Sequence, residues 1–137
     1  MVNLIAGSKG TGKTKKLVDL IKKAVEEESG SIVCLEKDKN LTYDIPYTAR
    51  LVHASDYSFG SMEYFKGFIS GLHAANYDIS HVFIDNLLKI LDEPDMNKIA
   101  SLLDELNAFG ERENIKFTIT ATVDTEKIGD NIKKYCQ

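Results

Sequence analysis

The sequence predicts an α/β domain, a three-layer α/β/α sandwich with a mainly parallel sheet of about five strands. Three observations lead to this fold class. Short apolar runs of the length of buried strands recur along the 137 residues. Amphipathic stretches with apolar residues at helical spacing separate these runs, and such alternation favours a parallel sheet covered on both faces. A glycine-rich segment joins the first apolar run to the first amphipathic stretch.

The first half of the chain contains three predicted strands and one long helix. An apolar run at 2–6 predicts the first strand, and apolar residues at helical spacing predict a helix over 13–28. A Ser-Gly pair ends this helix, and a second apolar run predicts a buried strand at 31–36. The segment 37–46 is polar and rich in turn residues. A shorter apolar run at 50–54 predicts the third strand.

The second half continues the alternation. Apolar residues on one face predict a helix over 61–75, and the next apolar run predicts a buried strand at 81–85. A helix over 95–113 follows, and its first residue is an aspartate that can cap it. The last strand, 117–123, alternates apolar residues with threonines, which favours a half-exposed face for the threonines. A terminal helix is predicted to start at 124–125.

Size and composition favour one domain, 1–137, of an ordinary globular protein. The chain is 43% hydrophobic and 28% charged, and no apolar run is long enough to span a bilayer, so we expect no membrane insertion. Cys34 and Cys136 form no metal-binding or redox motif, which favours a cytoplasmic protein with reduced thiols. The net charge of −4 argues against nonspecific nucleic-acid binding.

The glycine-rich segment matches the phosphate-binding loop (P-loop, or Walker A) pattern G-x-x-x-x-G-K-[ST]. Its position between a predicted strand and a predicted helix is the context that this motif requires. The pattern predicts a nucleotide-binding site formed by nine consecutive residues: Gly7, Ser8, Lys9, Gly10, Thr11, Gly12, Lys13, Thr14 and Lys15.

The residue types in this loop suit a triphosphate. Glycines allow the chain to wrap closely, so that backbone N–H groups can donate to phosphate oxygens. The helix that begins near Lys13 turns its positive dipole end towards the same anion. We expect Lys13 to reach the β- and γ-phosphates, which gives it a catalytic role, and the Thr14 hydroxyl to bind Mg²⁺. ATP is the expected nucleotide because the sequence lacks the guanine-reading Asn-Lys-x-Asp segment.

A second site residue is predicted at the end of the strand at 81–85. Asp85 follows three apolar residues, and ligands of open parallel sheets bind at the carboxyl ends of the strands. We therefore expect Asp85 to bind Mg²⁺ together with Thr14. A capping role for the following helix is the simpler alternative for a strand-end aspartate.

With these two motifs the chain resembles P-loop NTPases, specifically their RecA-like division. The resemblance implies the P-loop NTPase fold, with a strand between those that carry the loop and the Mg²⁺-binding acid. It also implies a catalytic glutamate at the end of the strand after the first helix, a position that Glu36 occupies here. Many hydrolysing relatives have Glu after the Mg²⁺-binding acid, whereas this chain has Asn86. Either Glu36 activates water, or hydrolysis is slow or absent.

Other polar and aromatic residues allow two readings. Thr120 and Thr122 stand where relatives place a residue that senses the γ-phosphate, but β propensity favours the simpler interpretation that they cover a half-exposed strand face. Four aromatic residues in or near loops could stack on a base or contact a partner, but we predict that they pack over the sheet edge: Tyr43, Tyr47, Tyr57 and Phe59.

Three functions follow from these features. The first is a Mg²⁺-dependent ATPase that hydrolyses the β–γ bond of ATP. The second is a small-molecule kinase of nucleoside type, for which the chain has little length for a lid. The third is a non-hydrolysing, nucleotide-gated binding module, whose activity would depend on a protein partner or on a homo-oligomer.

Overall fold

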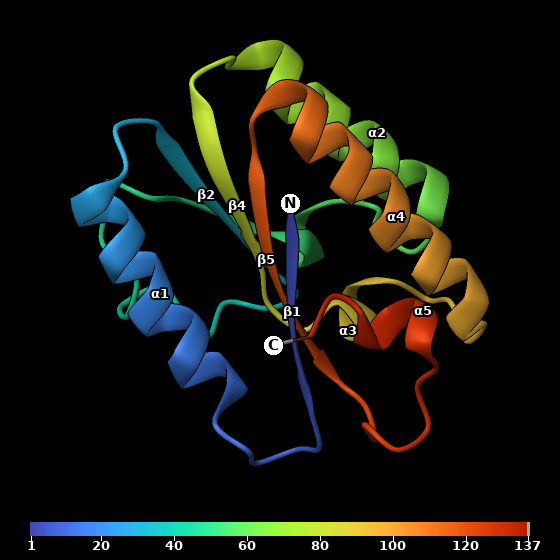
Figure 1. Cartoon of the computed structure of the whole chain (residues 1–137). Coiled ribbons are helices and arrows are strands. Elements are labelled where there is room, and N and C mark those ends of the chain that lie inside the picture. Colours follow the sequence, from blue (N-terminus) through green and yellow to red (C-terminus); the bar gives the residue numbers. More distant parts are fainter. Residues whose placement is uncertain (137) are drawn as a thin grey trace.

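The computed structural model describes residues 1–136 and contains one five-stranded sheet in which every pair of neighbours is parallel (Figure 1). The strand order is β1-β5-β4-β2-β3. The strands are β1 (Val2–Gly7), β2 (Ser31–Glu36), β3 (Arg50–His53), β4 (Ile79–Ile84) and β5 (Lys116–Thr122). The predicted α/β class and the parallel sheet of about five strands are thereby confirmed.

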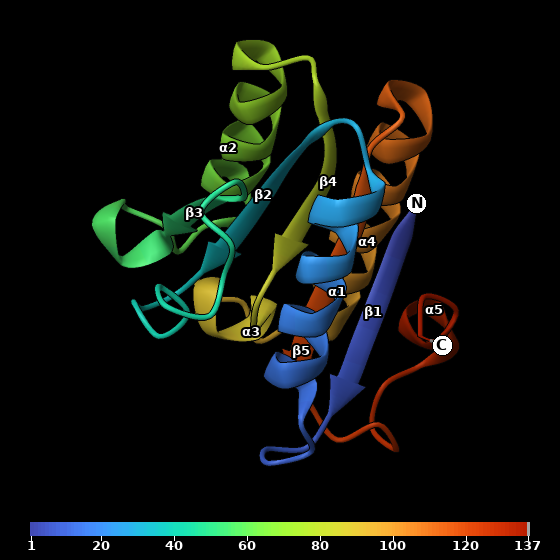
Figure 2. The same cartoon turned by 90° about the vertical axis from the view of Figure 1, so that its left-hand side faces the viewer.

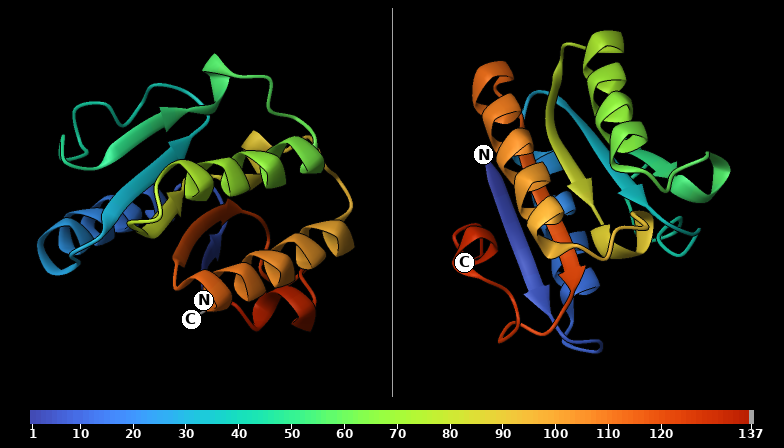
Figure 3. Two further views of the ribbon diagram at one scale, coloured as in Figure 1. Left: turned by 90° about the horizontal axis from the view of Figure 1, so that it is seen from above. Right: turned by 90° about the vertical axis from the view of Figure 1, so that its right-hand side faces the viewer.

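Helices connect the strands and cover both faces of the sheet. They are α1 (Lys13–Glu27), α2 (Met62–Ala75), α3 (Leu87–Ile90), α4 (Met96–Glu113) and α5 (Asp130–Lys133), with a 3₁₀ turn at Ala54–Asp56. Helix α1 lies alone on one face, and α2 and α4 lie side by side on the other (Figures 1 and 3). Two faces are covered because each crossover between parallel strands must return over the sheet.

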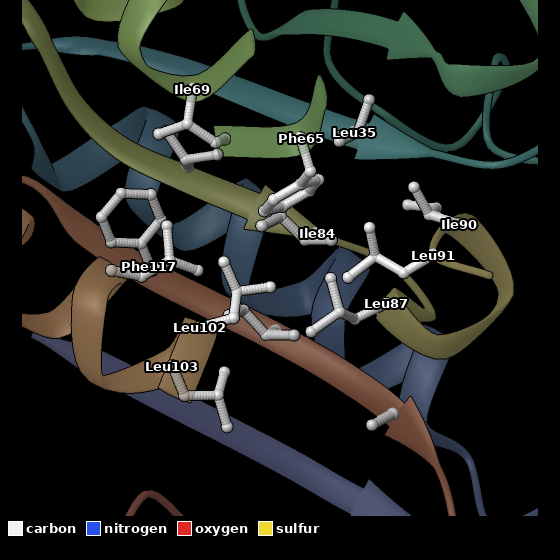
Figure 4. Close-up of a cluster of buried hydrophobic side chains, with 14 of the residues drawn as sticks. Leu35, Phe65, Ile69, Ile84, Leu87, Ile90, Leu91, Leu102, Leu103 and Phe117 are labelled. Carbon is white, nitrogen blue, oxygen red and sulfur yellow. The ribbon is translucent and has the colours of Figure 1, made fainter. Parts of the chain in front are cut away.

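The larger of two apolar cores lies between the sheet and helices α2 and α4 (Figure 4). Phe65 of α2, Ile84 of β4, Leu102 and Leu103 of α4, and Phe117 of β5 are fully buried in it. The inner strands are buried on both faces, which is why their sequences read as continuous apolar runs.

A smaller core lies between the sheet and α1. Leu17 and Ile21 of α1 pack there against Cys34 and Phe83 of the inner strands. Leu41, from the turn-rich segment 37–46, also packs into this core. The segment has no helix or strand, but its apolar residues hold it against the domain.

Side-chain caps start the long helices α2 and α4, and the one at Asp95 was predicted. The Ser61 side chain accepts a hydrogen bond of 3.0 Å from the Tyr64 N–H at the start of α2, and Asp95 accepts one of 2.9 Å from Asn97 at the start of α4. Such bonds satisfy backbone donors that the first helical turn leaves unpaired.

Two predictions about the elements were wrong, and one helix was missed. The terminal helix spans only Asp130–Lys133, because the chain after β5 first makes turns in which Asp124 binds the Glu126 N–H at 3.0 Å. The one-turn helix α3 was missed, since four residues are too short to show a period. The threonines of β5 do not lie on a half-exposed face, because Thr118 and Thr120 are buried under α1.

The outer edge of β1 is partly paired with the end of the chain. The Leu4 N–H donates to the Tyr135 carbonyl at 2.8 Å, and Leu4 forms a parallel bridge with Cys136. Among residues 1–136, no helix is both long and apolar enough to cross a membrane.

Candidate functional site

The carboxyl ends of β1, β4 and β5 meet at one edge of the sheet, which Figure 2 shows together with the start of α1. Gly7 ends β1, and Asp85 directly follows β4. Strand β5 lies between these two strands, so one strand separates the glycine-rich loop from Asp85. Sheet order brings together residues that are more than seventy positions apart in the sequence.

Two glycines of the loop have dihedral angles that other residues rarely adopt. Gly10 has φ +85° and Gly12 has φ +82°, both in the left-handed region. A Cβ atom at Gly7 would lie only 2.8 Å from the Thr11 hydroxyl oxygen. The loop therefore folds tightly before α1 begins at Lys13, and both features depend on glycine at these positions.

The Lys13 side chain folds back over the loop. Its Nζ donates a hydrogen bond of 2.7 Å to the Ser8 carbonyl and lies 3.4 Å from the Thr11 hydroxyl. Beside it is a surface depression of about 310 Å³, and its lining residues come from the loop, from α1, from β5 and from the turn after β4: Lys9, Gly10, Gly12, Lys13, Thr14, Lys15, Asn86, Thr120 and Thr122. Three lysines and the start of a helix make this depression suitable for an anion.

The side chains of Thr14 and Asp85 meet beside the depression. The Thr14 Oγ1 lies 3.3 Å from Asp85 Oδ1 and 3.5 Å from Oδ2. A hydroxyl and a carboxylate are the hard oxygen donors that Mg²⁺ prefers. The described residues contain no group of three or more His, Cys, Asp or Glu side chains that could hold a metal ion. A divalent cation held by this pair alone would need further oxygen ligands from outside the protein.

Thr120 joins β5 to the same carboxylate. Its hydroxyl lies 2.9 Å from Asp85 Oδ1 and accepts a hydrogen bond of 2.7 Å from the Asn86 N–H. Asn86 has φ +59°, a conformation that asparagine adopts more readily than most residues. The contact between Thr120 and Asp85 was missed at the sequence level. The available signal was the placement of three threonines on one face of the last strand.

Glu36 occupies the predicted place at the end of β2, but its carboxylate is bound to the segment that follows it. Its oxygens accept hydrogen bonds from the N–H groups of Asn40 at 3.0 Å and Leu41 at 3.2 Å, and one lies 3.3 Å from His53 Nδ1. Burial raises the pKa of Glu36, and these partners only partly offset that effect. Glu36 does not line the depression beside Lys13.

The tyrosines of the turn-rich segment do not pack over the sheet edge. Tyr43 and Tyr47 are 100% and 98% exposed, so for them that prediction was wrong. Tyr57 is half-exposed and its ring lies 6.1 Å from that of Phe68 in α2.

A larger depression, of about 570 Å³, lies beside the first turns of α2 and α4. None of the predicted site residues lines it. Within this depression the Lys66 ammonium forms an ion pair with Glu105 at 2.8 Å, so these two opposite charges largely neutralise each other. Its chemistry points to no particular ligand.

The chain matches no known protein-family model, and a search of curated proteins gave no relative.

Proposed function

We propose that this chain is an ATP-binding protein of the P-loop NTPase fold, RecA-like division, that hydrolyses the β–γ bond of ATP with Mg²⁺. The observation that carries the proposal is the meeting of Thr14 and Asp85 at 3.3 Å beside the start of α1 and the Lys13 side chain. The strand between β1 and β4, expected from the resemblance, supports the same proposal.

Binding would use groups already gathered at the loop. The free N–H groups at the start of α1 and the Lys13 ammonium would donate to phosphate oxygens, and Lys9 and Lys15 would add positive charge at the rim. Lys13 can exchange its bond to the Ser8 carbonyl for a bond to phosphate, which is the stronger acceptor because it is charged.

Thr14 and Asp85 would hold the metal ion. When bound, Mg²⁺ neutralises charge on the β- and γ-phosphate oxygens. The Asp85 carboxylate keeps an oxygen for this purpose, since Oδ2 has only the 3.5 Å contact to Thr14.

Hydrolysis would also require a group that orients or deprotonates the attacking water, and Glu36 is the proposed residue. Its raised pKa would suit a general base, because such a base works best when its pKa approaches the working pH. It would act from a carboxylate that also binds the amides of Asn40 and Leu41.

That same carboxylate favours a second candidate, a nucleotide-gated binding module without turnover. If Glu36 stays bound to the segment 37–46, the site has the phosphate and metal groups but no free water-activating acid. The two candidates share the nucleotide site and differ only in the release of phosphate.

The first test is a calorimetric titration of the wild-type protein, Lys13→Ala and Lys22→Ala with MgATP. Lys22 is an exposed lysine of the same helix, nine positions further on, and serves as the matched control. We expect saturable binding by wild type and Lys22→Ala. Binding by Lys13→Ala should be at least about tenfold weaker, because a charge-assisted hydrogen bond contributes roughly 1.5–3 kcal/mol.

Absence of binding by wild type, or equal binding by Lys13→Ala, would contradict the proposal. Phosphate release by the same samples then separates the candidates. Turnover supports the ATPase, and tight binding without turnover supports the binding module.

A further inference from the structure

Thr120 is a buried polar residue near the carboxyl end of β5. It is only 1% exposed, and its strand neighbours Ile119 and Ala121 are also buried. Valine has nearly the same shape and is common in such strands, so the hydroxyl needs a reason. Its two hydrogen bonds supply one, since both lead to the residues that follow β4.

The direction of these bonds follows from their chemistry. The Asn86 N–H can only donate, so it uses an acceptor position of the Thr120 oxygen. An ionised carboxylate can only accept, so the single hydroxyl hydrogen of Thr120 points to Asp85 Oδ1 at 2.9 Å. The result is a directed chain from the Asn86 amide through Thr120 to the Asp85 carboxylate.

We infer that Thr120 is a positioning residue for the metal-binding carboxylate. By holding Asp85 Oδ1, it fixes the rotation of the carboxylate and leaves Oδ2 available beside Thr14. The inference rests on the proposed function, in which Asp85 and Thr14 bind Mg²⁺. Residues that orient metal ligands in this way typically contribute 10–100-fold to metal affinity.

This role differs from sensing the γ-phosphate. The only hydrogen of the Thr120 hydroxyl is directed at Asp85, so Thr120 has no donor left for a phosphate oxygen. Thr122, two residues further along β5, is exposed and lines the depression. Its hydroxyl is not hydrogen-bonded to Asp85 or Asn86. The two threonines therefore have separate tasks.

The test measures how strongly Mg²⁺ promotes nucleotide binding. The probe is the β,γ-imido analogue of ATP, titrated calorimetrically with excess Mg²⁺ and with EDTA. In Thr120→Val we expect the Mg²⁺-dependent gain in affinity to fall by about 10–100-fold, while binding in EDTA stays within about threefold of wild type. Thr120→Ser, which keeps the hydroxyl, should restore the gain.

Thr118→Val is the matched control. Thr118 is a buried threonine on the same face of β5, but its hydroxyl binds His81 at 2.7 Å and not Asp85. The Mg²⁺-dependent gain should be unchanged in this variant. Binding in EDTA also reports whether each variant is folded, and Thr120→Ala replaces Thr120→Val if the latter does not fold.

Asp85→Asn completes a double-mutant cycle. Once the carboxylate is gone, Thr120→Val should reduce the Mg²⁺-dependent gain no further, whereas a purely structural role would give additive losses. A wild-type gain that Thr120→Val leaves intact overturns this inference alone. Wild-type binding without any Mg²⁺-dependent gain overturns the metal role of Asp85 as well, and absence of binding overturns the proposed function.

Discussion

The Glu36 carboxylate binds the segment after β2, and its proposed second role is to activate water; a substitution can separate the two. It holds the amides of Asn40 and Leu41, and it lies close enough to Asp85 for the charge of that residue to raise its pKa, after the larger effect of burial. A glutamine at this position would keep one oxygen for the backbone amides but could not accept a proton from water.

Glu36→Gln therefore tests the water-activating role. We expect MgATP affinity within about threefold of wild type, and phosphate release reduced by about 10²–10⁴-fold, the usual contribution of a general base. Binding is measured by calorimetry and turnover by a phosphate assay. Asp38→Asn, which changes an acid of the same segment that pairs with Lys89 at 3.1 Å, is the control. Unchanged turnover in Glu36→Gln would leave Glu36 only its structural role.

At the scale of elements, helix α4 lies unusually close to the sheet at Gly110. A Cβ atom there would lie 2.4 Å from the Ile115 carbonyl oxygen and 2.9 Å from the Met1 nitrogen. Both neighbours belong to the backbone, so they cannot move aside as a flexible side chain could. Gly110 is therefore required by packing, although glycine is a poor helix former.

Gly110→Ala should destabilise the protein by about 1–3 kcal/mol, the usual cost of overpacking a core. Gly71→Ala is the matched change in α2, where a Cβ atom meets nothing within 4 Å. It should stabilise the protein by up to about 1 kcal/mol, because alanine is the better helix former. Urea unfolding of the two variants gives both values, and equal effects would contradict the argument.

At the scale of the whole molecule, a partly buried polar cluster links the end of α1 to the amino ends of the inner strands. The His81 ring lies 2.8 Å from Glu28 through Nδ1 and 2.7 Å from Thr118 through Nε2. Lys116 lies 3.6 Å from the same glutamate. Burial lowers the pKa of His81, although Glu28 acts in the opposite direction. The pKa of Glu28 is also lowered, because the bonds from His81 and Ser80 outweigh its own burial.

The sign of the resulting pH dependence is determined by these directions. A lowered His81 pKa means that, as the pH falls below about 6.5, the unfolded chain takes up a proton that the folded protein does not. The contribution of His81 to the free energy of unfolding is therefore fully present above that pH. It is lost as the pH falls towards the pKa of His81 in the folded protein. One such proton gives a slope of at most about 1.4 kcal/mol per pH unit. Glu28, whose pKa is lowered, causes a further loss of stability at lower pH. Glu36, whose pKa is raised, has the opposite effect and favours the folded protein as the pH falls.

Urea unfolding at pH 7.5 and 5.5 measures this contribution. Wild type should lose stability over this interval, and His81→Phe, which keeps a ring beside Phe83, should lose less. Comparison of the two proteins removes the effect of Glu36, which both contain. An equal loss in both proteins would show that His81 does not cause it.

Much of the local structure could be predicted because it depends on near neighbours in the chain. The bounds of β2 and the Asp95 cap follow from an apolar run and a short-range hydrogen bond. The predicted start of the terminal helix was wrong because turn-forming residues lie among its apolar ones. The chain makes turns up to Gly129, and the helix begins only after them. Thr118 and Thr120 were misplaced because their burial comes from α1, which is distant in sequence.

The sequence by itself determined the α/β class, the glycine-rich loop before α1 and the positions of Asp85 and Glu36 at strand ends. These features depend on residue type and on local spacing. Only the tertiary structure decided which strand lies between β1 and β4, that Thr120 holds Asp85, and that the Glu36 carboxylate binds the segment after it. The physical reason is that strand order and side-chain partners arise from contacts between distant segments, which local patterns do not encode.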